Sequence, residues 1–386
     1  MSIEEAQVVQ DTVALVRIDS QNPGVQEGEC ARWVHERLQR AGIAVTTQAV
    51  QPGRDNLIAR VPGHGRGPRL VLLAHLDTVP IGAGWSVPPL EGRIRDGRIY
   101  GRGAADMKAG LAVASNLLAS LAGSPVPASE IVLCATVDEE GPDMAGAHAL
   151  VAGGLVTADD QVLALEPTGL RLRIAQMGLR WMELTVHGKM AHAGRAHLGI
   201  DANHVMARIV DRLKARVDAL PYEDGLLGRP RFTCGTLVGG VATNVVPPWS
   251  RAQLDVRLVP PMTSDDAMDL VRSVAEQTIV AFPGARYELA GLGAARPPVR
   301  AADDAHVVTH LRDAYQSVLG RLLESGGADG HEAYTDASMV AALTGSASCT
   351  VFGPGSSDQA HTADEFVPIA DIEAVSEVLE RMVAEW

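Results

Sequence analysis

Four apolar runs that end at, or shortly before, a residue able to bind a metal constrain this chain more than any other feature. They are residues 69–74 (RLVLLA) before His75, 130–137 (EIVLCATV) before Asp138, 161–165 (QVLAL) before Glu166, and 348–352 (SCTVF) before a glycine turn and His361. Short, β-rich and continuously apolar runs are typical of buried strands in a largely parallel sheet. We therefore expect an α/β fold, in which ligands bind outside the carboxyl ends of the strands.

The acids and histidines that follow these runs predict a two-metal site. Together with Asp106 from the loop GRGAADMKAG, the chain can gather two imidazoles and three or four carboxylates at one edge of the sheet. Such a set would repel itself unless cations lay among it. Each residue alone has an ordinary alternative, because most histidines are surface groups and an isolated Glu-Glu pair is usually solvated. Coincidence explains five such candidates poorly in a chain that is only 21% charged.

Asp77 lies two residues after His75. In an extended segment, residues at this spacing project to the same side. We expect the Asp77 carboxylate to accept the second ring N–H of His75 and so to fix its tautomer. The three adjacent acids Asp138, Glu139 and Glu140 cannot be assigned separate roles from the residues alone.

The order of expected elements indicates one domain inserted into another. A chain of 386 residues exceeds what one hydrophobic core usually supports. Helices at 3–18, 26–41 and 109–121 alternate with strands at 43–50, 55–62 and 69–74, which is α/β order. From about Met177 the order changes to β-α-β-β-α-β, with strands at 179–187, 231–238, 251–259 and 286–290 and helices at 200–217 and 263–281. This order is typical of a ferredoxin-like unit.

The α/β pattern returns with helices at 304–323 and 371–385. We therefore expect a catalytic domain made of residues 1–176 and 292–386, interrupted by an inserted α+β domain at 177–291. The stretch Gly291–Val299 is rich in proline and glycine. Such composition is typical of loops, and we expect it to be the return hinge.

Composition disfavours two classes of partner. Lysine and arginine total 33 against 47 acids, giving a net charge of −14, which disfavours binding to nucleic acid or to an anionic membrane. The four cysteines are isolated and form no CxxC, so they are expected to be core residues in a reducing compartment. Neither a secretion signal nor an apolar run of membrane-spanning length is apparent, and we expect a cytoplasmic protein.

The strings LAHLDTVP, GRGAADMKAG, TVDEEG, LEPTG and FGPGSSDQAH, in this order, resemble a known family. It is the family of co-catalytic zinc amidohydrolases and exopeptidases that includes aminoacylase, carboxypeptidase G, acetylornithine deacetylase and succinyl-diaminopimelate desuccinylase. The resemblance implies two divalent metal ions per subunit, most simply zinc, with cobalt or manganese as alternatives. It implies that Asp106 bridges both ions, that His75 and Glu166 complete one and Glu140 and His361 the other, and that Glu139 is the general base. It also implies a cis peptide at Asp106-Met107.

For the inserted domain the resemblance implies a lid that also forms a homodimer. His192, in GKMAHAGRAH, would reach into the active site of the neighbouring subunit and stabilise the oxyanion; its alternative is an exposed turn residue. Asn244 and Arg257 resemble positions that hold a substrate carboxylate, although an arginine on a strand is as often a salt-bridging surface residue. Gly355, in the turn FGPGSS, could bring backbone N–H groups near the same anion.

These observations predict a hydrolase that cleaves the amide bond of a small N-acyl amino acid or dipeptide-like substrate with a water bridging two metals. The first alternative is hydrolysis of a non-peptide C–N bond, in an aryl amine or a carbamoyl amino acid, at the same site. The second is a non-catalytic metal-binding protein. Glu139 counts against the second, because a purely structural site has no use for an unliganded acid beside it.

Overall fold

The computed structural model describes residues 3–23, 27–321 and 333–386, and these fall into two compact units. The main unit contains the chain up to Ala175, a segment that starts at Arg300, and Thr335–Trp386. The inserted unit contains Gln176–Val299 and Tyr334. The short strands β8 (Ala175–Gln176) and β13 (Val299–Arg300) pair with each other where the chain passes from one unit to the other.

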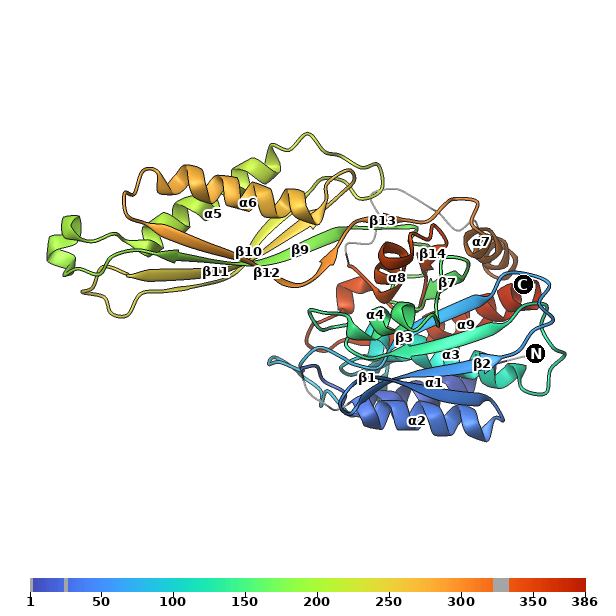
Figure 1. Cartoon of the computed structure of the whole chain (residues 1–386). Coiled ribbons are helices and arrows are strands. Elements are labelled where there is room, and N and C mark those ends of the chain that lie inside the picture. Colours follow the sequence, from blue (N-terminus) through green and yellow to red (C-terminus); the bar gives the residue numbers. More distant parts are fainter. Residues whose placement is uncertain (1–2, 24–26, 322–332) are drawn as a thin grey trace. The chain divides into compact units, whose positions relative to one another are not determined.

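The main unit is built on a mixed sheet with the strand order β1-β2-β6-β3-β7-β14 (Figure 1). Strand β3 is parallel to β6 and β7, and β14 is parallel to β7, whereas β1 and β2 form an antiparallel extension. The strands are β1 (Ala44–Gln51), β2 (Arg54–Val61), β3 (Leu70–His75), β6 (Ile131–Thr136), β7 (Gln161–Ala164) and β14 (Cys349–Val351). The four apolar runs are thus the parallel strands β3, β6, β7 and β14, whose carboxyl ends share one edge.

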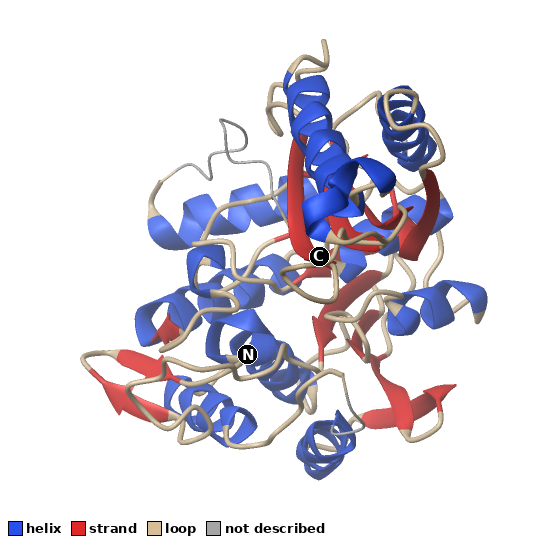
Figure 2. Ribbon diagram, turned by 90° about the vertical axis from the view of Figure 1, so that its left-hand side faces the viewer, coloured by secondary structure: helices blue, strands red, loops and turns tan. Residues whose placement is uncertain are grey.

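Every residue of β3 and of β6 is buried, because helices cover both faces of this sheet. Helix α3 packs against β2, β3 and β6, and α8 packs against β3, β7 and β14. Figure 2 shows the helices in blue and the strands in red. The helices of the main unit are α1 (Glu5–Val16), α2 (Glu27–Arg40), α3 (Ala109–Leu121), α4 (Ala145–Ala152), α7 (His306–Leu319), α8 (Asp336–Thr344) and α9 (Ile369–Ala384). Within the described ranges, no helix is long and apolar enough to cross a membrane.

A small antiparallel sheet brings two distant loops together. It has the order β15-β5-β4, from β4 (Arg93–Arg95), β5 (Arg98–Tyr100) and β15 (Phe366–Pro368). Strand β5 leads into the short helix η1 (Ala104–Lys108), and β15 follows the 3-10 turn η3 (Ser357–Gln359) by a few residues. The loop that contains Asp106 therefore lies beside the segment that contains His361.

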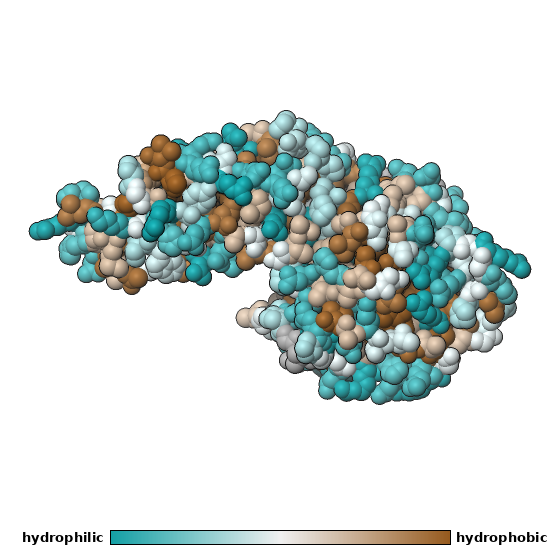
Figure 3. All heavy atoms as spheres, in the orientation of Figure 1, coloured by the Kyte–Doolittle hydropathy of each residue, from teal (hydrophilic) through white to brown (hydrophobic). Residues whose placement is uncertain are grey.

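The inserted unit has the expected β-α-β-β-α-β order. Its elements are β9 (Gly178–His187), α5 (Ala202–Asp218), β10 (Arg231–Gly239), β11 (Trp249–Leu258), α6 (Ser264–Ile279) and β12 (Arg286–Arg296), with a 3-10 turn η2 (Ala193–Leu198) after β9. The antiparallel sheet has the order β10-β11-β9-β12, and α5 and α6 pack on it and on each other. Large apolar side chains that stay exposed in this unit include Leu237, Val238 and Val241, and brown patches interrupt the polar surface in Figure 3. The expected fold class is confirmed.

Strand β12 differs from the sequence expectation. It was expected to end at residue 290 before a hinge at Gly291–Val299, but it continues to Arg296, which pairs with Leu179 after a register shift. A side chain at Gly291 would overlap the guanidinium of Arg180, which lies over the strand. The glycine therefore allows a close approach inside a strand and does not mark a break.

Candidate metal centre

Nitrogen and oxygen donors gather where the parallel strands of the main unit end. Two groups of three donors each have their ligand atoms within 4.8 Å of one another. The first group is His75, Asp106 and Glu166, and the second is Asp106, Glu140 and His361. A third group, His75 with Glu139 and Glu140, overlaps both. The five ligands that the resemblance implies are thus the members of the first two groups.

Asp106 lies between the two groups with one oxygen toward each. Its Oδ1 is 3.1 Å from Nε2 of His75, and its Oδ2 is 3.3 Å from Nε2 of His361. His75 is also 3.7 Å from Glu166, and His361 is 3.1 Å from Glu140. A carboxylate oriented in this way can bridge two cations. The peptide bond Asp106-Met107 is cis, as the resemblance implied.

The two groups differ in access to solvent. The side chain of His75 is 1% exposed, whereas that of His361 is 53% exposed. The second group therefore lies on the open side of the cluster.

The cluster contains several carboxylates and only two histidines, so without cations its negative charges are not balanced by nearby positive groups. Burial alone would lower the pKa of His75, but Glu166 and Asp106 raise it well above its usual value. Hydrogen bonds with Asp106 and Glu140 raise the pKa of His361 to about 10. Burial raises the pKa of Glu166 well above its usual range, and the charge of Asp106 adds to this. A metal ion that bound here would displace these protons, because metal ligands coordinate in their deprotonated forms.

The residue types fit divalent metals. Imidazole nitrogens and carboxylate oxygens are ligands of zinc, and the same mixed set suits cobalt and manganese. Glu139 is half-buried beside this set. Burial raises the pKa of Glu139 well above its usual value; His75 opposes the shift, and Glu166 and Glu140 add to it. A raised pKa suits a carboxyl group that accepts a proton and later returns it.

Asp77 supports the cluster in a different way from the one expected. Nδ1 of His75 is 2.9 Å from the backbone oxygen of Asp77 and 3.6 Å from its carboxylate. The carboxylate instead accepts hydrogen bonds from Asn22 at 2.8 Å and from the backbone N–H groups of Glu139 and Glu140 at 3.3 and 3.2 Å. Asp77 therefore orients His75 through its main chain and holds the segment of the two glutamates through its side chain.

The structure separates Asp138 from the two acids that follow it. Asp138 has a positive φ of 64° and is buried. Its carboxylate accepts hydrogen bonds from Asn22 at 3.0 Å and from Arg54 at 3.1 Å, and Arg54 also pairs with the buried Glu27. Sequence reasoning missed this network, because Asn22 and Arg54 lie 116 and 84 positions away from Asp138 and no local pattern connects them.

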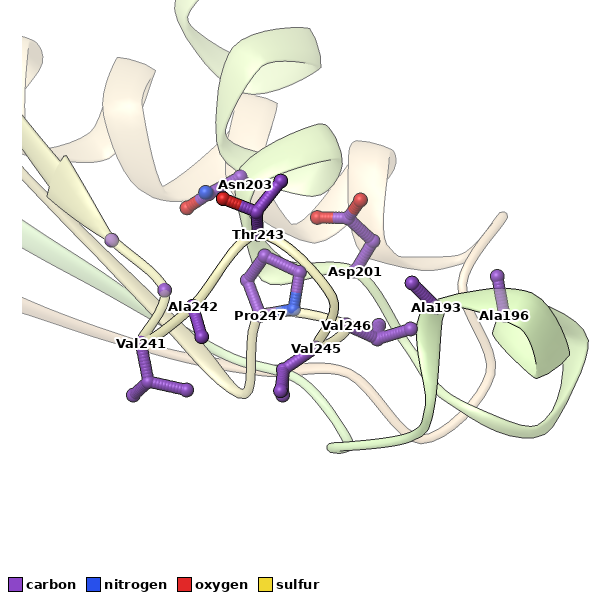
Figure 4. Close-up of a pocket in the computed structure, with 12 residues that line it drawn as sticks. Ala193, Ala196, Asp201, Asn203, Val241, Ala242, Thr243, Val245, Val246 and Pro247 are labelled. Carbon is purple, nitrogen blue, oxygen red and sulfur yellow. The ribbon is translucent and has the colours of Figure 1, made fainter.

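In the inserted unit, His192 and Asn244 lie close together. The N–H of Ala193 donates to the backbone oxygen of Asn244 at 3.0 Å. Both residues are exposed. Their chain neighbours Ala193, Thr243 and Val245 are among the residues that line a cavity of about 610 Å³ (Figure 4). Nδ1 of His192 accepts the N–H of Gly194 at 3.0 Å. The neutral ring therefore carries its hydrogen on Nε2, which can donate to a ligand.

The two remaining predicted residues already have polar partners. Nε and Nη2 of Arg257 lie 3.1 and 2.9 Å from the carboxylate of Asp255, which is the salt-bridged arrangement described by the alternative. Gly355 lies in the main unit after β14, has a φ of 82°, and donates its N–H to Asp371 at 3.2 Å. The roles of both residues in substrate binding stay predictions.

Comparison with known proteins gives consistent matches over the chain. The model of a family described as peptidase family M20/M25/M40 matches residues 71–385. The chain is 28% identical to a succinyl-diaminopimelate desuccinylase of Rhodospirillum centenum, over 97% of either protein. It is 31% identical to an acetylornithine deacetylase of Myxococcus xanthus, over 92% of this chain and 91% of the relative. The crystal structure of a tripeptidase from Staphylococcus aureus has the same fold, with a TM-score of 0.81, 23% identity and coverage of 100% and 99%.

Proposed function

The chain belongs to peptidase family M20/M25/M40, and we propose that it hydrolyses the amide bond of a small N-acylated amino acid or dipeptide-like substrate. It is an enzyme, a metal-dependent amidohydrolase, and this excludes the non-catalytic alternative. The observation that carries the proposal is Asp106, whose two oxygens face two separate groups of donors. Similarity over nearly the full length to a desuccinylase and to a deacetylase supports an acylated amino acid as substrate.

We propose that the two groups bind two divalent ions, most simply zinc, with cobalt or manganese as alternatives. One ion would be held by His75, Asp106 and Glu166, and the other by Asp106, Glu140 and His361. When bound, the ions would supply the positive charge that lowers the pKa of water and polarises the substrate carbonyl.

Glu139 is the proposed general base. Its carboxyl group would take the proton of the attacking water and return it to the amide nitrogen, which must be protonated before it can leave as an amine. The acids on either side of Glu139 in the sequence are less suited to this role. Asp138 is engaged with Arg54, and Glu140 belongs to the second donor group.

Recognition of the substrate is proposed to involve the inserted unit. Nε2–H of His192 would donate to the oxygen on which negative charge develops, across the interface of a homodimer. Asn244 and Arg257 would bind the carboxylate of the substrate, and arginine suits a planar carboxylate because it can donate two parallel hydrogen bonds. Gly355 would contribute through the backbone of its turn, because its own N–H already has a partner.

A substrate screen tests the proposed reaction. The metal-loaded protein is assayed with acetyl, succinyl, formyl and carbamoyl amino acids and with dipeptides, and released amine is measured. Metal-dependent release from the acyl amino acids or dipeptides supports the proposal. If only carbamoyl or aromatic C–N substrates turn over, the first alternative replaces it.

The role of Glu139 predicts a separation of metal binding from turnover. Glu139→Gln is expected to lower kcat by at least about 100-fold, because a positioned general base contributes a factor of this order. Native mass spectrometry should still find two metals per subunit. Loss of a metal would instead make Glu139 a ligand, as its place in the third donor group allows. Unchanged turnover would remove it from the mechanism.

A further inference from the structure

Glu365 has a fully buried carboxylate around which a loop of the main unit folds. Its Oε1 accepts the N–H groups of Ala105 and Asp106 at 2.9 and 3.1 Å. Its Oε2 accepts the N–H of Gly103 at 3.1 Å and pairs with the guanidinium of Arg102 at 2.6 Å. One carboxylate therefore binds polar groups of Arg102, Gly103, Ala105 and Asp106.

This set of contacts dictates the conformation of the loop. A buried carboxylate is retained only where charged or polar donors replace its lost hydration. Three backbone N–H groups can point at one carboxylate only if the chain curves around it, and Gly103 takes a φ of 81° to allow this. A side chain without the negative charge would keep one acceptor oxygen, but its other end would present a hydrogen-bond donor to N–H groups that are themselves donors.

The same residue connects both sides of the second donor group. One of its hydrogen bonds is with the N–H of Asp106 itself, so it fixes the main chain from which the shared carboxylate extends. Glu365 also follows His361 by four residues and immediately precedes β15, which pairs with β5. Its backbone oxygen accepts the N–H of Gly101 at 2.9 Å. Glu365 thus links the main chain of Asp106, through one hydrogen bond, to a residue only four positions from His361.

We propose that Glu365 is a positioning residue. It sets the placement of Asp106 relative to His361, and thereby the affinity of the second metal, which is the ion that Asp106, Glu140 and His361 would hold. The inference rests on the proposed function, in which Asp106 is shared between two ions. The competing explanation is that Glu365 only neutralises Arg102 and stabilises the fold. The two explanations differ in whether metal affinity changes by more than stability does.

Glu365→Gln tests the proposal in the full-length protein. The amide keeps the shape of the carboxylate but presents an NH₂ group, a donor, to backbone donors. Zinc affinity is measured by competition with a chromophoric chelator, and thermal unfolding of the metal-free protein is followed in parallel. We expect the second zinc to bind at least about 10-fold more weakly, as is usual when a residue that orients a ligand is lost. Binding of two zinc ions with wild-type affinities would overturn the proposal.

Two control variants remove a similar charge elsewhere. Asp364→Asn changes the neighbouring residue, whose carboxylate accepts hydrogen bonds from Ser86 and not from the Asp106 loop. Asp160→Asn changes a buried carboxylate that pairs with Arg69 at 2.6 Å and caps a turn at the opposite end of β3 and β7. Both are expected to retain both zinc affinities. If Asp160→Asn weakens the second zinc as much as Glu365→Gln does, the effect is one of general stability and the proposal is wrong.

Glu365→Asp covers the case in which the glutamine variant does not fold. It keeps the charge beside Arg102 but retracts the carboxylate by one methylene from the N–H groups of Ala105 and Asp106. We expect native circular dichroism with weakened binding of the second zinc, and wild-type affinity here would refute the positioning role. The wild-type protein tests the proposed function separately, because fewer than two zinc ions per wild-type subunit would contradict the two-metal site whatever the variants do.

Discussion

Gly110 in helix α3 offers a sharp test of how the site is positioned. A Cβ at this position would lie 2.1 Å from the backbone oxygen of Leu165 and 3.0 Å from the side chain of Met107. Leu165 immediately precedes Glu166, and α3 immediately follows the loop of Asp106. Because a backbone oxygen cannot rotate away, Gly110→Ala must move the helix or the end of β7. Either shift changes the separation of two ligands of the first donor group.

The magnitude follows from two opposing effects. Alanine gains about 0.5 kcal/mol over glycine inside a helix. Forced overpacking costs about 3 kcal/mol when relief requires a backbone shift, so Gly110→Ala is expected to lose about 2.5 kcal/mol of stability. Gly28 is the matched control, because it is also the second residue of its helix and has nothing within 4 Å of the added Cβ. Gly28→Ala should therefore be neutral or slightly stabilising.

The two variants are compared by urea denaturation of the metal-free protein and by zinc titration. Gly110→Ala should unfold at lower urea than wild type and bind the first zinc more weakly, while Gly28→Ala changes neither quantity unfavourably. If Gly110→Ala is as stable as Gly28→Ala and binds zinc normally, the contact between α3 and Leu165 does not constrain the site, and the reasoning is refuted.

Two further predictions concern groups outside the centre. Cys234 is the one cysteine that is not fully buried, and burial raises the pKa of the other three thiols to about 11 or 12. A thiol reagent at pH 8 should label one cysteine in the native protein and four after denaturation, as mass spectrometry can count. Burial and His310 lower the pKa of His306, so the unfolded chain binds a proton there at higher pH than the folded chain. Stability should fall as pH drops below about 6.5, and His306→Gln should reduce that fall in the unfolding temperature; an identical pH profile would contradict this.

The strand ends could be predicted because their signal is local. Continuous burial requires continuous apolar sequence, so β3, β6 and β7 are visible as runs, and the residues after them must meet at one edge of a parallel sheet. His75 and Glu166 follow from this reasoning alone, whereas Glu140 could not be distinguished in this way from the adjacent Asp138 and Glu139. His361 follows the fourth run only after a glycine turn, and Asp106 follows no such run; the small sheet of β5 and β15 brings their loops together.

The supporting residues could not be predicted, since their roles depend on contacts between distant segments. Glu365 accepts the N–H of a residue 260 positions earlier, and nothing in its local sequence distinguishes it from the adjacent Asp364. Asp138 has a positive φ and accepts hydrogen bonds from the distant Asn22 and Arg54, and neither feature is visible in the sequence around it. The sequence predicted a hinge from Gly291, whereas the structure continues the strand. Composition cannot distinguish a glycine that breaks a strand from one that makes space for Arg180.

The inserted unit also affects the order in which the protein can fold during synthesis. Strands β3, β6 and β7 leave the ribosome before the inserted unit, and β14 and His361 leave it afterwards. The inserted unit is nearly continuous in sequence, so it can fold as it emerges, whereas the apolar strands of the main unit must wait for their last neighbour. A nascent chain stalled after Val299 therefore exposes the unpaired edge of β7. At that stage the chain is most prone to aggregate through this edge, and a chaperone that covered the edge would protect it.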